Sequence, residues 1–479
     1  MEKSIPELGA ALDSGAVTSH SLVQAYLERI ERYDHTGPAL NAMIAINPRA
    51  LADADALDAE RRAGHRRGPL HGIPVVIKDN YDTADMPTTA GSIALNGSRP
   101  ERDAFQVRKL RDAGAIILGK TNLHEFARGI TTVSSLGGQT RNPYDLTRNP
   151  GGSSGGTGAA IAADFAAAGM GTDTCGSIRY PAAHNNLVGL RPTLGLSSRS
   201  GIVPLAHSQD VGGPLARSVV DIAIMLDATV GPDPDDPVTA DAARHVPQSY
   251  RAALDAGALR GARIGVLTSL FGDAPEDRRV GSVVQNALGA MAQRGAELIE
   301  VAEGGWPSEA DVSVIRYEFK FDVDDYLRRT PRAPVHSLAE ILQKGLVLPA
   351  LQTGFERSNE VATLDTADYR DARRRQAALH DRLLKLLDDN RLDALAYPTL
   401  RRTAAKIGEP QTGGNCAESA ASGLPAITVP AGFADDGMPV GVELLARAYA
   451  EPRLLALAYA FEQATHARRP PIFTKKGWN

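Results

Sequence analysis

The stretch PGGSSGGTGAAIAADFAAAGMGTDTCGSIR, residues 150–179, decides how the rest of the chain is interpreted. Glycine and serine gather at its two ends, and the residues between are mostly alanine, a composition that favours a tightly packed helix. Ser153 and Ser177 would then lie in separate loops at the two ends of one rigid spacer. Because glycine has no side chain to block an approach, backbone N–H groups in these loops could come close to a carbonyl oxygen or a phosphate.

Length and composition indicate a globular chain. Its 479 residues exceed the roughly 250 to 300 at which single cores stop growing, so one large domain and two domains are equally open. The 52 basic and 57 acidic side chains give a net charge of -5, and no nucleic-acid partner is expected. The first residues lack the apolar core of a signal peptide, and no apolar run reaches a membrane span, so no membrane association is expected.

The two cysteines, Cys175 and Cys416, are far apart in the sequence and form no metal-ligand pattern. Free cysteines are typical of reducing compartments. We therefore expect both thiols to be reduced and the protein to be cytoplasmic.

Lys78 ends a short apolar run, residues 73–77, that predicts a buried strand. One interpretation is structural: the side chain reaches the surface or pairs with Asp79. The other is catalytic: burial and nearby donors lower the pKa of the amine and make it a neutral base. Nothing local decides between them.

The remaining periodicity predicts scaffold elements. Helices are expected over residues 5–32 with a break at residues 14–15, and over 48–64, 309–329, 367–389 and 451–468. A helix and strand are expected within 103–119, and strands over 262–267, 296–301, 392–397 and 426–429. The polar loop 129–149 is a candidate pocket wall. Residues 346–355, in a segment without a clear period, either line the entrance of a site or pack over the sheet.

Three common explanations of the residues around Ser153 fit the sequence poorly. Residues 151–155 fit the G-x-S-x-G motif, but no convincing strand precedes them as that motif requires. A phosphate-binding loop needs a lysine followed by serine or threonine after Gly156, and these are absent. A flexible linker fits poorly, because an ordered helix is expected to follow at once.

Several motifs together resemble the amidase signature family of serine amidohydrolases. They are GIPVVIKDN (72–80), PGGSSGG (150–156), GTDTCGSIRYPAA (171–183), GLRPTLGLSSRSGIVPL (189–205) and SGLPAITVPAGF (422–433). The resemblance implies an α/β fold with a mixed central sheet of roughly eleven strands between helices. It also implies one domain over residues 1–479: a helical segment (1–65), a core with the catalytic residues (66–230), and the rest of the sheet with its covering helices (231–479).

The resemblance assigns roles to residues. Ser177 matches the nucleophile, Ser153 the bridging serine that follows a cis peptide bond, and Lys78 the base that finally takes the proton. The implied oxyanion donors are the backbone N–H groups of Thr174, Cys175, Gly176 and Ser177, and the implied supporting residues are Ser154, Asp173 and Arg179. The family commonly has glycine where Cys175 stands, and Cys175 as an alternative nucleophile has no histidine near it in the sequence. We interpret Asp173 and Arg179 as a structural ion pair, and leave open whether Ser154 serves the relay or fills a turn.

Histidine chemistry is the main rival, because a Ser-His-Asp triad would also activate a serine. His184 and His207 follow Ser177, but both read as residues of connecting loops. No histidine spacing indicates a metal site. No cofactor and no metal are expected.

The sequence therefore predicts an amidohydrolase that cleaves a primary amide, an anilide or a carbamate-like substrate, which includes urethanase activity, through an acyl-enzyme. The expected partner is this small-molecule substrate, with Gly129, Ile130 and Gln139 as candidate contacts, and a homodimer is left open. The alternative is the amidase (A) subunit of a tRNA-dependent amidotransferase that releases ammonia from glutamine. Residues 129–138, GITTVSSLGG, differ from the pattern expected of that subunit. A catalytically inactive relative is disfavoured because all three triad residues are present.

Overall fold

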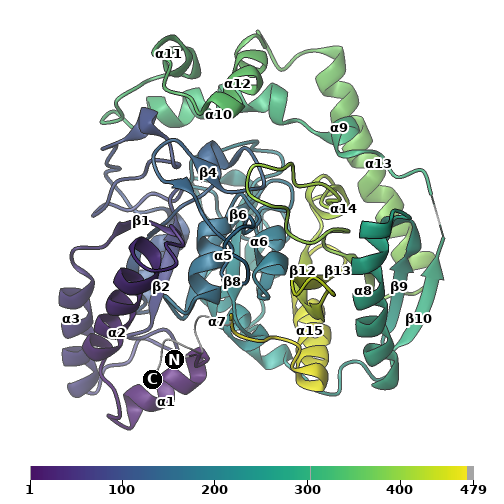
Figure 1. The fold of residues 1–479 in the computed structure, drawn as a ribbon, viewed down its shortest axis with the longest axis horizontal. Coiled ribbons are helices and arrows are strands. Elements are labelled where there is room, and N and C mark those ends of the chain that lie inside the picture. The colour runs from purple at the N-terminus through teal and green to yellow at the C-terminus, as the bar shows by residue number, and fades with distance from the viewer. Residues whose placement is uncertain (1, 303, 472–479) are drawn as a thin grey trace.

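The computed structural model describes residues 2–302 and 304–471, which form an α/β fold around one large sheet (Figure 1). The strands of this sheet are β1 (Met43–Ile46), β2 (Pro74–Lys78), β3 (Ile116–Thr121), β6 (Ala168–Asp173), β7 (Val188–Arg191), β8 (Val211–Ala216), β9 (Arg263–Leu267), β10 (Glu297–Val301), β11 (Ala394–Pro398), β12 (Ala426–Phe433) and β13 (Pro439–Leu445). A separate short hairpin joins β4 (Val133–Ser134) to β5 (Gly138–Gln139).

The helices up to the middle of the chain are α1 (Ile5–Asp13), α2 (Ser19–Ile30), α3 (Ala50–Arg62), α4 (Phe105–Asp112), α5 (Gly155–Ala162), α6 (Arg179–His184), α7 (Val219–Thr229) and α8 (Pro275–Gln293). Those that follow are α9 (Glu309–Val312), α10 (Ile315–Arg328), α11 (Leu338–Gln343), α12 (Gln352–Asn359), α13 (Ala367–Asp389), α14 (Ala417–Ala420) and α15 (Glu451–Thr465). Short single-turn helices connect several of them.

The sheet has eleven strands in the order β1-β3-β2-β6-β8-β7-β12-β13-β11-β9-β10, and the prediction of a mixed sheet is confirmed. Strands β3, β2 and β6 run parallel to one another, as do β11, β9 and β10. The strands between these two groups pair antiparallel. The carboxyl ends of β2 and β6 therefore lie next to each other at one edge of the sheet, which is where ligands commonly bind in such sheets.

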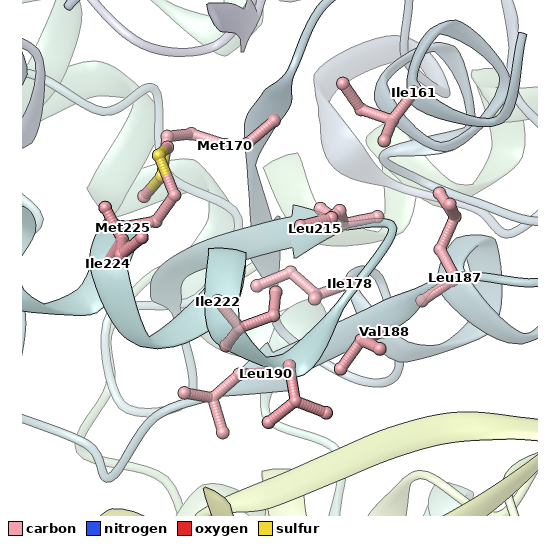
Figure 2. Packing of buried hydrophobic residues seen from close by; sticks show 14 of the residues in the cluster. Ile161, Met170, Ile178, Leu187, Val188, Leu190, Leu215, Ile222, Ile224 and Met225 are labelled. Carbon is pink, nitrogen blue, oxygen red and sulfur yellow. The ribbon is translucent and has the colours of Figure 1, made fainter. Parts of the chain in front are cut away.

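Helices cover both faces of the sheet, and the alternation of side chains along β6 shows how. A Cβ added at Gly169 or Gly171 would come within 2.6 Å of Thr157 or 2.7 Å of Ser154, so this face of β6 lies directly against α5 and the turn before it. Met170 points to the other face, where it packs near Met225 of α7 (Figure 2). Glycine is needed in this strand because α5 approaches so closely.

The buried apolar side chains between sheet and helices form one main core. Figure 2 shows Leu190 and Leu215 from the sheet beside Ile222 from α7, all fully buried. A second cluster joins Phe126 to Phe319 of α10 and Phe355 of α12. The outer helices α10, α11 and α12 lie along one side of the molecule, at the top of Figure 1, and this second cluster attaches them.

Most sequence predictions of scaffold elements are confirmed, including the break before α2, where Thr18 caps the helix. The single helix predicted between Ser153 and Ser177 is wrong. Helix α5 ends at Ala162, the chain turns at Asp164, which has a φ of 61°, and it then enters strand β6. Alanine and glycine suit any closely packed layer, so their abundance did not distinguish a buried strand from a helix. The predicted helix 309–329 is also split, into α9 and α10.

Candidate active site

Lys78 lies at the carboxyl end of β2, and its side chain is 0% exposed. The amine nitrogen Nζ is 2.7 Å from Ser153 Oγ and 2.7 Å from Thr172 Oγ1. Burial lowers the pKa of Lys78 from its ordinary value of about 10.4 to about 7, and the carboxylates of Asp173 and Asp210 oppose the shift only in part. Lys78 neither reaches the surface nor pairs with Asp79, which forms an ion pair with Lys120 instead.

Ser153 is fully buried, and the peptide bond before it, Gly152–Ser153, is cis. The Ser153 carbonyl accepts a hydrogen bond from the His124 N–H at 3.0 Å, which fixes the turn. The next residue donates its N–H to the carbonyl of Ser177 at 3.1 Å. The two serine loops therefore touch directly, although 23 residues separate Ser154 from Ser177 in the chain (177 − 154).

Thr172 in β6 links the lysine to the strand beneath it. Its hydroxyl contacts Lys78 Nζ and accepts from Asn80 Nδ2 at 3.0 Å. The Ser154 hydroxyl bonds both backbone groups of Thr172, at 3.2 Å each. Ser154 thus joins the two loops to β6 through the backbone, and Thr172 and Asn80 are site residues that the sequence reasoning did not identify.

The loop that carries Ser177 is held by a buried carboxylate. Asp173, at the end of β6, accepts hydrogen bonds from the N–H groups of Gly176 at 2.8 Å and Ile178 at 3.2 Å. Arg179 and Arg191 lie 3.0 Å and 3.2 Å from its oxygens. Burial alone would raise the pKa of Asp173, but the two guanidinium groups outweigh it and hold the pKa well below its ordinary value. The prediction of an Asp173–Arg179 ion pair is confirmed, and the network extends to Arg191.

Arg179 also contacts Glu443 of β13, and its Nη2 donates to the carbonyl of Cys416 at 3.4 Å. A buried charge pair is costly unless its remaining hydrogen-bonding groups are satisfied, and this network satisfies most of them. It ties the Ser177 loop to the centre of the sheet. Ser177 itself is 4% exposed.

The backbone N–H groups predicted as oxyanion donors are in different situations. The Gly176 N–H is engaged by Asp173, so this geometry does not present it to a substrate. For the N–H groups of Cys175 and Ser177, the described part of the chain records no protein acceptor. Gly176 has a φ of 84°, and a Cβ there would lie 2.6 Å from the ring of Tyr180, so only glycine suits this turn.

Cys175 and Cys416 form a disulfide, with a Cα–Cα distance of 5.1 Å and a sequence separation of 241 residues. The prediction of two reduced thiols is therefore wrong. Distance along the chain had suggested that the cysteines were unrelated, whereas the fold brings the start of α14 against the Ser177 loop. The expected cytoplasmic location stays a prediction and loses this support.

The predicted substrate contacts lie near the site but not at the described cavity. The Gln139 amide donates to three backbone carbonyls, those of Thr131, Thr132 and Thr140, which accounts for it structurally. Ile130 packs against a buried cluster made of Tyr180, Ala183, Leu400 and Cys416. A Cβ on Gly129 would meet the His124 ring at 2.4 Å, so the glycine permits this packing.

A cavity of about 260 Å³ opens beside the site on the side of Thr172. Its wall includes Asn80, Thr172 and Thr174, together with residues 199–205 and Tyr326. Residues 346–355 do not line it, and Phe355 belongs to the second apolar cluster, which favours the packing interpretation of that segment. Thr172, which lines the cavity, is also the residue that contacts Lys78 Nζ at 2.7 Å.

His184 and His207, the candidate bases of a Ser-His-Asp triad, both make contacts with residues other than Ser177. His184 lies at the end of α6, not in a loop as predicted, and its ring contacts the carbonyl of Arg402 at 3.4 Å. His207 lies 2.8 Å from Asp322. Among the described residues, two groups have the spacing of metal ligands: His207 with Glu318 and Asp322, and Cys175 and Cys416 with Glu309. The sulfur atoms of the second group are joined in the disulfide.

No helix within residues 2–302 and 304–471 combines the length and the apolar character needed to cross a membrane.

The chain is similar to known amidases in sequence and in fold. The family model described as Amidase matches residues 21–455. A crystal structure of native peptide amidase from Stenotrophomonas maltophilia superposes with a TM-score of 0.92 at 42% identity and covers 98% of this chain and 99% of that one. A probable amidase of Arabidopsis thaliana is 36% identical over 98% of this chain and 92% of its own length. The glutamyl-tRNA(Gln) amidotransferase of Halorhodospira halophila has a subunit, named A, that is 37% identical over 98% of this chain and 99% of its own length.

Proposed function

The chain belongs to the amidase signature family and is a hydrolase acting on carbon–nitrogen bonds, and from that premise we propose that it cleaves an amide through an acyl-enzyme on Ser177. The observation that carries the proposal is the contact of a fully buried lysine, Lys78, with the hydroxyl of Ser153 at 2.7 Å. A serine hydroxyl is a weak nucleophile and needs a group that can take its proton. A lysine with a pKa of about 7 is neutral in half of the molecules at neutral pH and can serve.

The proposed reaction runs through both serines. Ser177 Oγ attacks the amide carbonyl while its proton passes to Ser153 Oγ, and the proton of Ser153 passes to neutral Lys78. The same relay in reverse protonates the leaving nitrogen, which an amide requires because an amide anion leaves very poorly. Water then attacks the acyl-enzyme with the same base.

Backbone groups stabilise the negative charge of the tetrahedral intermediate in this proposal. The N–H groups of Cys175 and Ser177 are the donors that the resting loop leaves available among the described residues. The Asp173 network holds the loop from the opposite side through Gly176 and Ile178. Fixed donors of this kind typically contribute about 3 to 4 kcal/mol each in other hydrolases.

Among amides, anilides and carbamates, we place primary amides first, and amides of peptides among them, because the chain is so similar to a peptide amidase. The alternative is a protein that releases ammonia from glutamine within an amidotransferase, and the likeness to the Halorhodospira halophila amidotransferase chain favours it. The two proposals share the chemistry and differ in substrate and partner.

The test is a panel of primary amides, peptide amides, anilides, carbamates and glutamine, assayed for released amine or ammonia. We expect turnover of primary amides by the isolated chain and none by Ser177→Ala. Ser282→Ala, at an exposed position of α8, is the control and should keep wild-type activity. Turnover by Ser177→Ala would refute the acyl-enzyme. Glutamine hydrolysis only with a co-purified partner would favour the amidotransferase alternative.

A further inference from the structure

The disulfide joins the proposed oxyanion loop to a distant part of the chain. Cys175 stands two residues before Ser177, and its partner Cys416 stands immediately before α14. Cys175 is partly exposed and Cys416 is 3% exposed. Cys175 is thus the more exposed end of the disulfide, and Cys416 is its buried end.

The anchor at Cys416 is rigid. The amide of Asn415 donates to the carbonyls of Leu270 and Pro398 at 2.9 and 2.8 Å. Gly414 lies so close to Tyr180 that a Cβ there would be 2.3 Å from the phenol oxygen. The residues around Cys416 therefore have little freedom to move away from the catalytic loop.

The other supports of the loop act on its neighbours, not on Cys175. Asp173 holds Gly176 and Ile178, and the side chain of Thr174 donates to Asp210 at 2.5 Å. The Thr174 carbonyl accepts from Gln209 at 3.1 Å. The peptide whose N–H is a proposed oxyanion donor is thus held through its carbonyl by Gln209, and the disulfide fixes the side chain of Cys175 that follows it.

We propose that the Cys175–Cys416 disulfide is a positioning element that aims the oxyanion loop, so that breaking it lowers the rate of amide cleavage. The inference rests on the proposed function of Ser177 and its loop. A dithiol reductant attacks a sulfur of the disulfide, and the S–S bond breaks. The protein gains two electrons and two protons as two thiols, and the reductant closes into its own disulfide.

Three variants and the reduced wild type test this role, with the same primary amide throughout. Cys416→Ala, Cys175→Ala and the double variant should each lose about 10- to 100-fold in kcat, because small misplacements of donors cost rates of this order. KM should stay within about threefold, and the double variant should be no slower than either single variant. The dithiol should lower the kcat of the wild type by the same factor as the substitutions do, and reoxidation should restore that kcat. The kcat of the double variant should not change when the dithiol is added.

Circular dichroism at the assay temperature separates misplacement from unfolding, and thiol labelling of the wild type reports the extent of reduction. Full activity of folded Cys416→Ala, or of the fully reduced wild type, would overturn the proposal. So would a loss that follows the unfolded fraction alone. If Ser177→Ala stays active, the proposed function fails, whereas an inactive Ser177→Ala with an unimpaired Cys416→Ala refutes only the role of the disulfide.

Discussion

Two lysines lie near the carboxyl ends of neighbouring parallel strands, Lys78 as the last residue of β2 and Lys120 as the last but one of β3, and both are fully buried. Their surroundings differ. Lys120 of β3 lies 3.0 Å from the carboxylate of Asp79 and also donates to the carbonyl of Pro87 at 3.0 Å. Lys78 of β2 has two hydroxyl groups in reach and, among the described residues, no carboxylate in contact. In the ladder Lys78 is opposite Thr121 while Lys120 is opposite Ile77, so the two side chains leave the strands on opposite faces.

The difference shows what turns a buried amine into a base. A carboxylate at hydrogen-bond distance stabilises the ammonium form, whereas hydroxyl groups alone do not repay the loss of hydration. The pKa of Lys78 accordingly falls to about 7 because burial dominates. Position at a strand end is common to both lysines, so it is the partner that separates a structural lysine from a reactive one.

The largest expected effect on activity comes from replacing Lys78, the lysine that contacts hydroxyl groups and, within the described part of the chain, no carboxylate. Lys78→Met should lower kcat/KM by about 10²- to 10⁴-fold, because the relay loses its base. Its free energy of unfolding should not fall, since burying Lys78 in the neutral form already opposes folding below the ordinary lysine pKa. Steady-state kinetics and urea denaturation measure the two quantities. Activity within tenfold of the wild type would remove Lys78 from the mechanism.

Lys120→Met should have the opposite profile. It leaves the Asp79 carboxylate buried without its cation, and breaking a buried pair in this way costs about 3 to 5 kcal/mol of stability. The folded fraction should keep most of its kcat. Adding Asp79→Asn should recover part of the lost stability in a double-mutant cycle. An equal loss of activity in Lys120→Met and Lys78→Met would show that the two lysines are not distinct in function.

The smallest effect concerns the titration of Lys78. Its neutral form is the active one, so kcat/KM should rise with pH and level off above about 7, with a tenfold fall per pH unit well below that value. Thr172→Val removes one acceptor of the ammonium form, which should move the midpoint to lower pH and reduce the plateau a few-fold. A bell centred in acid, or a midpoint unchanged in Thr172→Val, would contradict this account.

Local patterns in the sequence were sufficient for much of the scaffold. The apolar run before Lys78 predicted β2, and the break at residues 14–15 predicted the division between α1 and α2. The resemblance to the family supplied the mixed sheet and pointed to Lys78 and Ser153, which the structure brings within 2.7 Å. Composition failed at residues 163–173, where alanine and glycine serve a turn and a strand.

What remained hidden depends on contacts between distant segments. Asp79 adjoins Lys78 in sequence, yet its partner is Lys120 on the neighbouring strand, and only the register of β2 against β3 reveals this. Cys416 meets Cys175 across 241 residues for the same reason. Asn80 contacts the site through Thr172; both residues lie within the motifs quoted above, but only their contact across the two strands shows their role.

The parallel pairing of β2 with β6 has a consequence for redesign. The base ends β2 and the loop that carries Ser177 begins at the end of β6, so the hydrogen-bond ladder between these strands sets where both start. The outer helices α10 to α12 attach through their own apolar cluster. That layer could be exchanged between relatives to alter which molecules are admitted, while the reactive geometry stays fixed by the strands beneath.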